Sequence, residues 1–552
     1  RRKRVTASTV QPGGNKLLRW TLAVAVAGAI AFALLAFVAG QDGNWDFYNS
    51  HFYNPYAFLN DRFWFDIQPA QRQTNISPFL DLPFYWLTLT WNIVAASLSY
   101  AAFQGQQASA VFLIMFLLLD RAGLPLRRAI ALALILTPLA ALSPLNLQLT
   151  GTTTGDSTTA VLVLWAVCLF LLAQSRFLGE SRGRTKMGLF MLAGILVGAA
   201  TGLKLTNGPY AVALAACALM AADQPDARFK RVLLVGLSML AGFLLAYGYW
   251  GWFLYSEFQN PLFPTFNQVF QSDFMKAVQL NDETFKATTP LGVAFYPFLY
   301  NAYTGALNYQ QFHDLRVPVV FVLVVLALVA LAISPGARSR LKANPLASTM
   351  ILFVLVSYVI WIYLFSISRY LVVLEVLALS VALTVAAIVF EKKLPSVILL
   401  IAAFTTIGVS TWHHTQRDNV FGYRSAWADT VFEIQFPDLD PGESMVLVSG
   451  GQAMAYLIPF LPQDTRWVRI DSNLNYVNYT SIEERYDNRM GEKLRDAIAS
   501  HDDRFYVMYT NGEGQYVRAD LAYFGIAHDP SSCLPVRSKA PPLIICSAYR
   551  TP

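Results

Sequence analysis

The stretch LLRWTLAVAVAGAIAFALLAFV, residues 17–38, decides the fold class. It is an apolar run of about 22 residues, long enough to cross a bilayer as one helix. The chain opens with RRKR, and Lys16 and Arg19 flank the start of the run. A cleavable signal peptide has a shorter apolar region and a cleavage site of small residues. We therefore predict a retained first span with its N-terminal end in the cytoplasm.

The composition of the whole chain also indicates a membrane protein. Of its 552 residues, 55% are hydrophobic and 14% are charged, against roughly 25% charged residues in typical soluble proteins. The mean hydropathy is +0.42. So few charges exclude a string of soluble domains, because their surfaces would be left uncovered, and they exclude a disordered chain, which would be polar.

The net charge of +6 arises from short basic clusters between apolar runs. About half of the 41 Lys and Arg residues lie in six such clusters. Basic residues gather on the cytoplasmic side of membrane proteins, whereas a nucleic-acid site would need a basic groove. The charge pattern therefore predicts membrane topology and no nucleic-acid partner.

Eleven apolar runs are predicted to span the membrane: residues 17–38, 108–119, 129–147, 159–173, 187–203, 209–222, 232–252, 317–333, 347–365, 370–390 and 396–411. With the N-terminus inside, every basic cluster then lies on the cytoplasmic side. Residues 82–103 are a further apolar run, and a separate span there would place Arg127 and Arg128 outside. We predict that this run lies at the outer interface or is re-entrant, as its Trp and Tyr residues favour. We find no long internal repeat of the kind that marks many transporters.

The last part of the chain is polar. We expect residues 1–411 to form the membrane domain and residues 412–552 a small α/β domain outside the membrane. VLVSG, RWVRI and FYVMYT are predicted strands, and SIEERYDNRMGEKLRDAIAS is a predicted helix. Cys533 and Cys546 are expected to form a disulfide, with two free thiols as the alternative. Cys168 and Cys217 lie in apolar runs and are expected only to pack.

Charged residues outside the cytoplasmic clusters and the tail gather at the outer face. The basic ones are Arg62, Arg72, Lys204, Lys276, Lys286, Arg316 and Arg369, and the acidic ones are Asp42, Asp46, Asp61, Asp66, Asp81, Asp156 and Asp314. Charges at membrane depth are costly and therefore indicate function. We predict a single polar site that opens to the outer side.

Three aspartates are the candidates for acid–base chemistry. Asp42 and Asp46 follow the first span in GQDGNWDFYNSHFYNPYAFLNDRFWFD, residues 40–66, whose aromatic residues suit a helix on the membrane surface. Both could instead be turn or N-cap residues, and function is favoured for Asp46 because Trp45 and Phe47 flank it. Asp156, in LTGTTTGDSTT, is well placed as a helix N-cap, and a functional role is compatible with that.

Two cations lie at the outer ends of predicted spans: Lys204 in TGLKLTNGPY and Arg369 in SISRYLVVLE. Either side chain can hold a phosphate, and the simpler interpretation is that it reaches to the interface. In FHDLR, residues 312–316, a local pair between Asp314 and Arg316 is the simpler account, with His313 beside it.

These motifs together resemble the GT-C superfamily of membrane glycosyltransferases, which includes the protein O-mannosyltransferases and the aminoarabinose transferases of lipid A. Asp46 matches the acidic residue of the family's first outer loop, and Asp156 matches a second acidic residue in the next. GLKLTNGP, around Lys204, is similar to a segment of the aminoarabinose branch, displaced by two positions, and Arg369-Tyr370 is similar to a recurring Arg-Tyr pair. NPLFPTFN, residues 260–267, is similar to a segment of bacterial GT-C-like proteins. The resemblance covers the membrane domain and not the tail.

The resemblance implies transfer of a sugar from a polyprenyl-phosphate donor to a hydroxyl of a glycan, glycolipid or protein, with inversion at the anomeric carbon. The reaction would take place at the outer face of the inner (cytoplasmic) membrane. It needs no nucleotide donor, which agrees with the lack of a Walker or Rossmann motif. The resemblance makes Asp46 the general base, and it makes Lys204 and Arg369 the phosphate ligands.

The remaining roles follow from the same resemblance. Asp156 would orient the acceptor, hold Lys204 or help to bind a divalent metal, which is the one possible cofactor. The candidate catalytic residues are thus Asp46 and Asp156, and the candidate substrate-binding residues are Asp42, His51, Lys204, Arg316, Arg369 and Tyr370.

The nearest alternative is an O-antigen ligase- or polymerase-like enzyme, which acts on lipid-linked glycans through a large outer loop rich in Arg and His. Here the loop at residues 253–316 has only Lys276, Lys286, Arg316 and one His. A transporter of lipid-linked sugars is less favoured, because it predicts charges at the midplane and a repeat. A receptor would leave the first-loop carboxylates and Lys204 unexplained.

Overall fold

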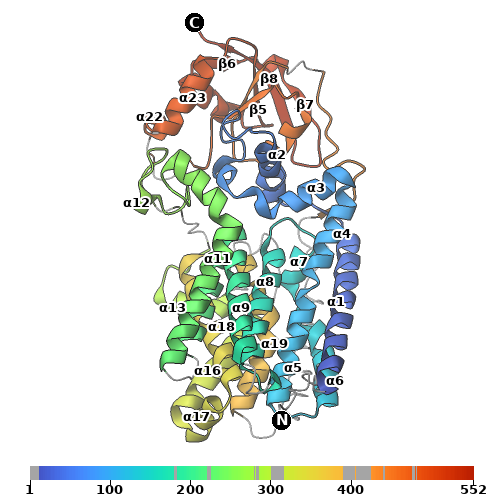
Figure 1. Cartoon of the computed structure of the whole chain (residues 1–552). Helices are drawn as coiled ribbons and strands as arrows, with labels where there is room; N and C mark the ends of the chain where they lie inside the picture. The colour runs from blue at the N-terminus through green and yellow to red at the C-terminus, as the bar shows by residue number, and fades with distance from the viewer. Residues whose placement is uncertain are drawn as a thin grey trace, which may run out of the picture.

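A computed structural model describes residues 12–178, 183–220, 225–278, 280, 285–299, 316–389, 405, 424–438, 442–474, 479 and 481–552. A helical bundle carries a smaller α/β domain at one end (Figure 1). The helices before the C-terminal domain are α1 (Pro12–Ala39), α2 (Tyr53–Leu59), α3 (Leu82–Thr90), α4 (Ile93–Gln104), α5 (Gln107–Arg121), α6 (Leu126–Ala141), α7 (Pro144–Leu149), α8 (Asp156–Gln174), α9 (Gly183–Leu203), α10 (Gly208–Met220), α11 (Pro225–Phe258), α12 (Asn267–Phe270), α13 (Pro290–Ala294), α14 (Tyr296–Leu299), α16 (Arg316–Ile333), α17 (Pro335–Lys342), α18 (Pro345–Leu364) and α19 (Val372–Val389).

Eight helical segments among the described residues are long and apolar enough to cross a membrane: Gly14–Ala39, Ile93–Arg121, Asp156–Gln174, Gly183–Leu203, Asp226–Phe258, Arg316–Ile333, Pro345–Leu364 and Ser368–Val389. Two more predicted spans are shorter helices, α6 with 16 residues and the segment Leu205–Met220. The predicted span 396–411 lies outside the described residues, apart from Thr405. The polytopic helical fold is confirmed, and the number of eleven spans stays a prediction.

The prediction of one interfacial helix over residues 82–103 is wrong in its second half. A new helix, α4, begins after Asn92, whose side chain accepts a hydrogen bond from the Ala95 amide at 2.8 Å. It packs along α1 so closely that a Cβ atom on Gly28 would lie 2.4 Å from the carbonyl oxygen of Gly105. Residues 93–121 thus form one candidate span. Because α4 and α5 count as one crossing, the cluster at Arg127 keeps the side that the charge pattern requires.

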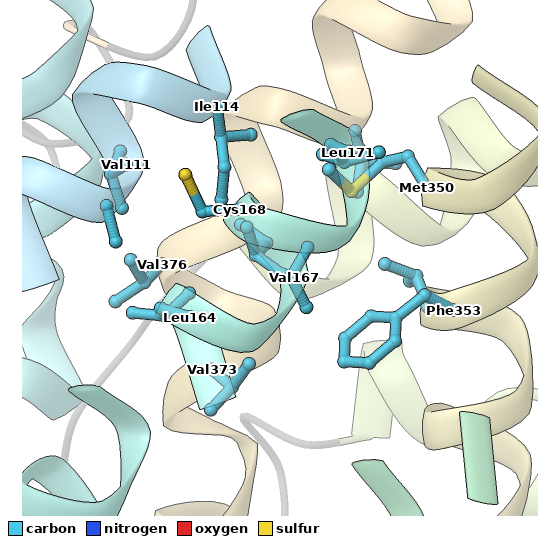
Figure 2. Packing of buried hydrophobic residues seen from close by; sticks show 14 of the residues in the cluster. Val111, Ile114, Leu164, Val167, Cys168, Leu171, Met350, Phe353, Val373 and Val376 are labelled. Atoms are coloured by element: carbon cyan, nitrogen blue, oxygen red, sulfur yellow. The ribbon is translucent and has the colours of Figure 1, made fainter. Parts of the chain in front are cut away.

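The bundle has a continuous apolar core between α5, α8, α18 and α19. Figure 2 shows Cys168 of α8 beside Ile114 of α5 and near Val376 of α19. Cys168 and Cys217 are free and buried, as predicted for residues that only pack. A core of this kind fixes α8 and α19 relative to each other, and both helices begin at the end of the bundle that faces the C-terminal domain (Figure 1).

The C-terminal domain contains a mixed six-stranded sheet. Its strands are β3 (Met445–Val448), β4 (Arg466–Arg469), β5 (Phe505–Thr510), β6 (Ile526–His528), β7 (Leu534–Val536) and β8 (Leu543–Arg550), in the order β4-β3-β5-β8-β6 with β7 paired to β8. Strands β4, β3 and β5 are parallel, and β8 is antiparallel to its neighbours. The helices are α22 (Ile482–Tyr486), α23 (Arg489–Ala499) and α24 (Gly514–Tyr523). The predicted disulfide between Cys533 and Cys546 is present.

The loop that follows α1 is bound to this sheet. Strand β1 (Gln41–Asp42) pairs with β2 (Arg424–Ser425), and Ile67 forms a parallel bridge with Val468. The buried Arg62–Asp66 pair continues the contact, because Asp66 accepts the Trp467 amide at 3.0 Å. The predicted boundary at residue 412 lies outside the described residues, so it stays a prediction.

A single arginine makes three hydrogen bonds at the contact between the loop after α1 and the C-terminal domain. Arg469 is fully buried, and its guanidinium donates to the carbonyl oxygens of Pro69 at 3.0 Å, Gly450 at 2.6 Å and Gln452 at 3.1 Å. The first of these belongs to the loop after α1, and the other two follow β3. The side chain therefore ties the loop to the carboxyl end of the parallel strands.

We predict that Arg469→Met loosens this contact and lowers stability. Three carbonyl groups would lose their donor, and the buried one, that of Pro69, would by itself cost about 1–3 kcal/mol if left unsatisfied. A loss of about 2 kcal/mol would lower the Tm by roughly 4–8 °C, and limited proteolysis would cut residues 60–75 faster. Arg518→Met, at an exposed arginine of the same domain, is the control. Equal Tm values for the two variants would contradict the assigned role.

Candidate active site

A cavity of about 520 Å³ lies at the end of the bundle that faces the C-terminal domain. Its wall is built from the loop after α1, the segments around residues 72–81 and 145–154, the end of α9, residues 262–265 and the segment between α18 and α19. Asp42, Asp46, His51, Lys204, Arg369 and Tyr370 line it. The structure thus brings together six of the eight predicted site residues, from segments that are far apart in the sequence.

Asp46 and Arg369 form the first ion pair of the cavity. The Arg369 Nη1 atom lies 2.6 Å from Asp46 Oδ2, and both side chains are largely buried. Burial alone would raise the pKa of Asp46, but Arg369, with His51 and Lys204, outweighs this effect and lowers the pKa to about 2. The ligand-free protein therefore holds Asp46 as a carboxylate that is a weak base.

Asp156 and Lys204 form the second ion pair, at 2.7 Å between Oδ1 and Nζ. Lys204 also donates to the Thr154 carbonyl, and Arg369 Nε lies 3.8 Å from Asp156 Oδ2. The cap position of α8 is Gly155, with a left-handed φ of 79°, so the alternative of Asp156 as the N-cap is wrong. Asp156 lies in the first helical turn, where a negative charge is favourable. The four side chains thus form one chain of alternating charge, in the order Asp46, Arg369, Asp156 and Lys204.

The loop that carries Asp156 is held by a buried polar network. Gln104 accepts the Gly151 amide at 2.7 Å, and Gln107 donates to the Ser157 hydroxyl at 2.8 Å. Ser157 in turn donates to Asn146 at 2.8 Å. Because these side chains come from α4, α5 and α7, the glycine-rich loop has a fixed place against three helices.

The carboxylate of Asp42 holds the local backbone in place. One carboxylate oxygen accepts the Asn44 amide at 3.1 Å, and the other accepts the Thr153 amide at 2.8 Å and the Thr153 hydroxyl at 3.1 Å. The turn interpretation made for Asp42 is therefore confirmed, with an added link to the loop before α8. Its predicted role in substrate binding stays a prediction.

His51 has an unforeseen partner, Asp81. The His51 Nδ1 atom lies 2.6 Å from Asp81 Oδ2, and both side chains are nearly buried. Burial acts to lower the pKa of His51, but the carboxylates of Asp81 and Asp46 raise it above the ordinary value. The two carboxylates thus favour the protonated form of His51 at the cavity wall. The sequence predicted only that Asp81 lies at the outer face. It gave no sign that Asp81 pairs with His51, because 30 residues separate the two side chains.

Tyr370 and Arg316 differ in their relation to the site. Tyr370 lines the cavity, and its ring lies 5.5 Å from the charged groups of both Lys204 and Arg369. Its carbonyl accepts the Tyr210 hydroxyl at 2.5 Å. Arg316 is the first residue of α16, is buried, and is not among the residues that line the cavity. His313 and Asp314 lie outside the described residues.

Two further charged residues support the cavity and were not assigned a role from the sequence. Arg72 lines the cavity and has no ion pair with a described residue. Glu375 is buried in α19 and accepts the Leu145 amide at 3.2 Å, which fixes α7 behind the wall. A carboxylate inside an apolar span is a general signal of function, and it could have identified Glu375.

A possible divalent metal was considered for Asp156. Within the described ranges, His528, Cys533 and Cys546 are the group whose ligand atoms have metal-like spacing, and its two cysteines form the disulfide. The carboxylates of Asp46 and Asp156 already pair with Arg369 and Lys204. This donor set fits bound anions better than a bound cation, and metal dependence stays open as a prediction.

Comparison with solved structures identifies the fold. The chain is similar to ArnT, an aminoarabinose transferase from Cupriavidus metallidurans, in its structure bound to undecaprenyl phosphate, with a TM-score of 0.51, 12% identity, and coverage of 95% of this chain and 97% of that one. It is also similar to the oligosaccharyltransferase of Archaeoglobus fulgidus, with a TM-score of 0.44, 13% identity, and coverage of 91% and 71%. The chain therefore has a fold similar to that of ArnT, and the predicted polytopic helical architecture with a small C-terminal domain is confirmed. No family model and no curated protein matches the sequence.

The low pKa of Asp46 leads to a pH-dependent prediction. Because the folded-state pKa of about 2 lies below the ordinary 3.8, the ionised carboxylate stabilises the folded protein above pH 3.8. This contribution is lost as the pH falls from 3.8 through about 2. Asp46→Asn should therefore unfold at a lower temperature than the parent protein at neutral pH, and the gap should narrow in acid. Asp464→Asn, at an exposed position, should show no such gap, and a gap that does not change with pH would contradict the ion pair.

Proposed function

Because the chain has a fold similar to that of ArnT, we propose that it is a glycosyltransferase that moves a sugar from a polyprenyl-phosphate donor to a hydroxyl acceptor at the membrane surface. The observation that carries this proposal is the pair of cations at helix ends, Lys204 and Arg369, which line one cavity with Asp46, and Asp156 pairs with Lys204 behind the cavity wall. Cations serve the phosphate of the donor and of the leaving group, and a carboxylate serves the acceptor hydroxyl.

The two cations would bind the donor phosphate by exchanging partners. In the ligand-free protein each cation is neutralised by an aspartate, which avoids an unpaired charge near the membrane. A phosphodiester has oxygens for both a guanidinium and an ammonium, and it would draw Arg369 away from Asp46. The apolar lining of the same cavity, which includes Leu262, Phe263 and Phe365, would accommodate the first part of the polyprenyl chain.

The exchange would also activate Asp46. Arg369 is the strongest of the cations that lower its pKa, so loss of that contact raises the pKa of Asp46 and makes the carboxylate a better base. Asp46 would then accept the proton of the acceptor hydroxyl as its oxygen bonds to the anomeric carbon. The bond from that carbon to the phosphate oxygen breaks, and its electron pair leaves with the phosphate. Donor binding would thus precede base catalysis.

The proposed orientation places the cavity and the C-terminal domain outside the cytoplasm. The first residues of α1 and the whole of α17, with Arg338, Arg340 and Lys342, lie at the opposite end of the bundle (Figure 1). Basic residues at that end are typical of the cytoplasmic side. The proposal is therefore a multi-pass protein of the inner membrane that works at its outer face.

We predict that Asp46→Asn abolishes transfer while the protein stays folded and inserted. The amide cannot accept the acceptor proton, and loss of a general base typically costs about 10²–10⁴ in rate. The assay measures release of polyprenyl phosphate from synthetic polyprenyl-phosphate sugars, with extracted envelope glycolipids as acceptors. Asp464→Asn is the control. Transfer by Asp46→Asn at close to the parent rate would refute the role of Asp46.

We predict that Arg369→Gln weakens binding of undecaprenyl phosphate. A hydrogen bond between charged groups contributes about 1.5–3 kcal/mol, so the Kd should rise roughly 10- to 100-fold. Microscale thermophoresis in detergent gives the Kd, and the exposed Arg537→Gln is the matched control. An unchanged Kd would remove Arg369 from the phosphate site.

One experiment tests the function as a whole. Mass spectrometry of envelope glycans and glycolipids, with and without the gene, should reveal one missing sugar. That product names the sugar and the acceptor class. An unchanged glycan profile, together with transport of lipid-linked sugar by the reconstituted protein, would favour a transporter instead.

A further inference from the structure

The pair of His51 and Asp81 has the form of a catalytic dyad. Asp81 engages His51 Nδ1 at 2.6 Å, which fixes the ring, and His51 Nε2 has no hydrogen bond with any described residue. Both residues line the same cavity as Asp46, Lys204 and Arg369. A histidine whose one nitrogen is held by a buried carboxylate, with the other nitrogen free beside a cavity, is arranged as the acid–base groups of hydrolases are.

The local backbone places His51 next to Asp46. Residues Phe47–His51 form a π-helix, with Asp46 at its N-cap position. A π-helical turn relates residues five apart, so Asp46 and His51 lie one turn apart along the same side. The other four residues of this turn are buried, and two of them, Phe47 and Tyr48, pack against Phe432 and Tyr456 of the C-terminal domain. The packing therefore fixes the register that brings the acid and the base together.

The charges that face His51 favour its protonated form. Asp81 contacts it from the segment before α3, Asp46 lies at the start of its own π-helix, and Lys204 approaches from the end of α9. The two carboxylates outweigh the ammonium, and the balance raises the pKa of His51 above its ordinary value. When His51 is protonated, its Nε2 proton is therefore free to be donated into the cavity, because Asp81 holds Nδ1.

We propose that His51, oriented by Asp81, is the general acid that protonates the departing phosphate of the donor. This inference rests on the proposed function and extends it, since the resemblance gave His51 only a place in substrate binding. The dianion of a phosphate monoester takes up one proton with a pKa of about 6, so an imidazolium is well matched to supply it. Lys204 and Arg369 hold the phosphate, and His51 completes its conversion to a stable leaving group.

The proposed step balances in atoms and charge. The acceptor hydroxyl gives its proton to Asp46 as its oxygen bonds to the anomeric carbon. The bond from this carbon to the phosphate oxygen breaks with both electrons on the oxygen, and His51 Nε2 gives its proton to the phosphate. Asp46 then returns the acceptor's proton to His51. The products are the glycoside and a singly protonated polyprenyl phosphate, with the same net charge as the donor.

The pH dependence of transfer tests this step. Because the protonated form of His51 is active, kcat at saturating donor should fall as the pH rises through the raised pKa of His51. Asp81→Asn removes the carboxylate that holds the proton, so the falling limb should move to lower pH. His51→Gln should lower kcat by about 10²-fold, which is the range for a lost general acid, and should remove the limb. His501→Gln, outside the cavity, is the matched control.

A binding experiment tests the dyad without any need for activity. The chain has six His residues, so protein labelled with ¹⁵N-histidine gives few signals, and His51→Gln identifies that of His51. We expect its pKa above 6.5 in the parent protein, a lower pKa in Asp81→Asn, and a shift of the signal on addition of undecaprenyl phosphate. A signal that does not respond to undecaprenyl phosphate would overturn the proposal.

The outcomes separate this inference from the proposed function. If the parent protein releases no polyprenyl phosphate from any sugar donor, the proposed function itself fails. If the parent is active and His51→Gln retains both its kcat and its alkaline limb, only the role of His51 fails. If His51→Gln is inactive but Asp81→Asn leaves the pH profile and the His51 signal unchanged, His51 is a structural residue and the proposal is refuted.

Discussion

The site depends on one electrostatic constraint: charges at the edge of a membrane must be paired. Lys204 and Arg369 lie at the ends of apolar helices, where water is scarce and an unpaired cation is costly. Asp156 and Asp46 neutralise them in the ligand-free protein. A ligand with negative charge can replace these carboxylates at little cost, because it restores the pairing that it breaks. The same constraint therefore stabilises the fold and selects an anionic ligand.

One part of the site is positioned by the helical bundle, and the other part is positioned by the C-terminal domain. Lys204, Arg369 and Asp156 lie at the ends of helices that are fixed by the apolar core of the bundle and by Gln104 and Gln107. Asp46 and His51 lie on a loop, and that loop is held by the C-terminal domain through strand pairing, aromatic contacts and Arg469. The C-terminal domain is thus a structural part of the cavity, because it sets the position of the proposed base and acid relative to the phosphate site.

The sequence predicted individual residues of the site better than their partners. Asp46, Lys204 and Arg369 were identified because charge beside an apolar span is rare and one-sided. The pairing of Asp46 with Arg369 was beyond sequence reasoning, since 323 residues separate them and only the packing of the bundle joins them. The dyad of His51 and Asp81 was missed for a related reason: the π-helical turn that aims His51 has no sequence signature of its own. Charge sidedness led to the wrong helix for residues 93–103, because it fixes only the number of membrane crossings and cannot detect that two apolar runs share one crossing.

The ion pairs also give a reason why the proposed base, Asp46, lies next to the proposed phosphate ligands, Arg369 and Lys204. If no cation lay beside Asp46, its burial would raise its pKa. Its pairing with Arg369 keeps it ionised but weak. In the proposed mechanism, a donor phosphate that engages Arg369 would both place the sugar and free the Asp46 carboxylate. The base would then gain strength only when a donor is bound, so a water molecule that enters the cavity before the donor would meet a weak base and no electrophile.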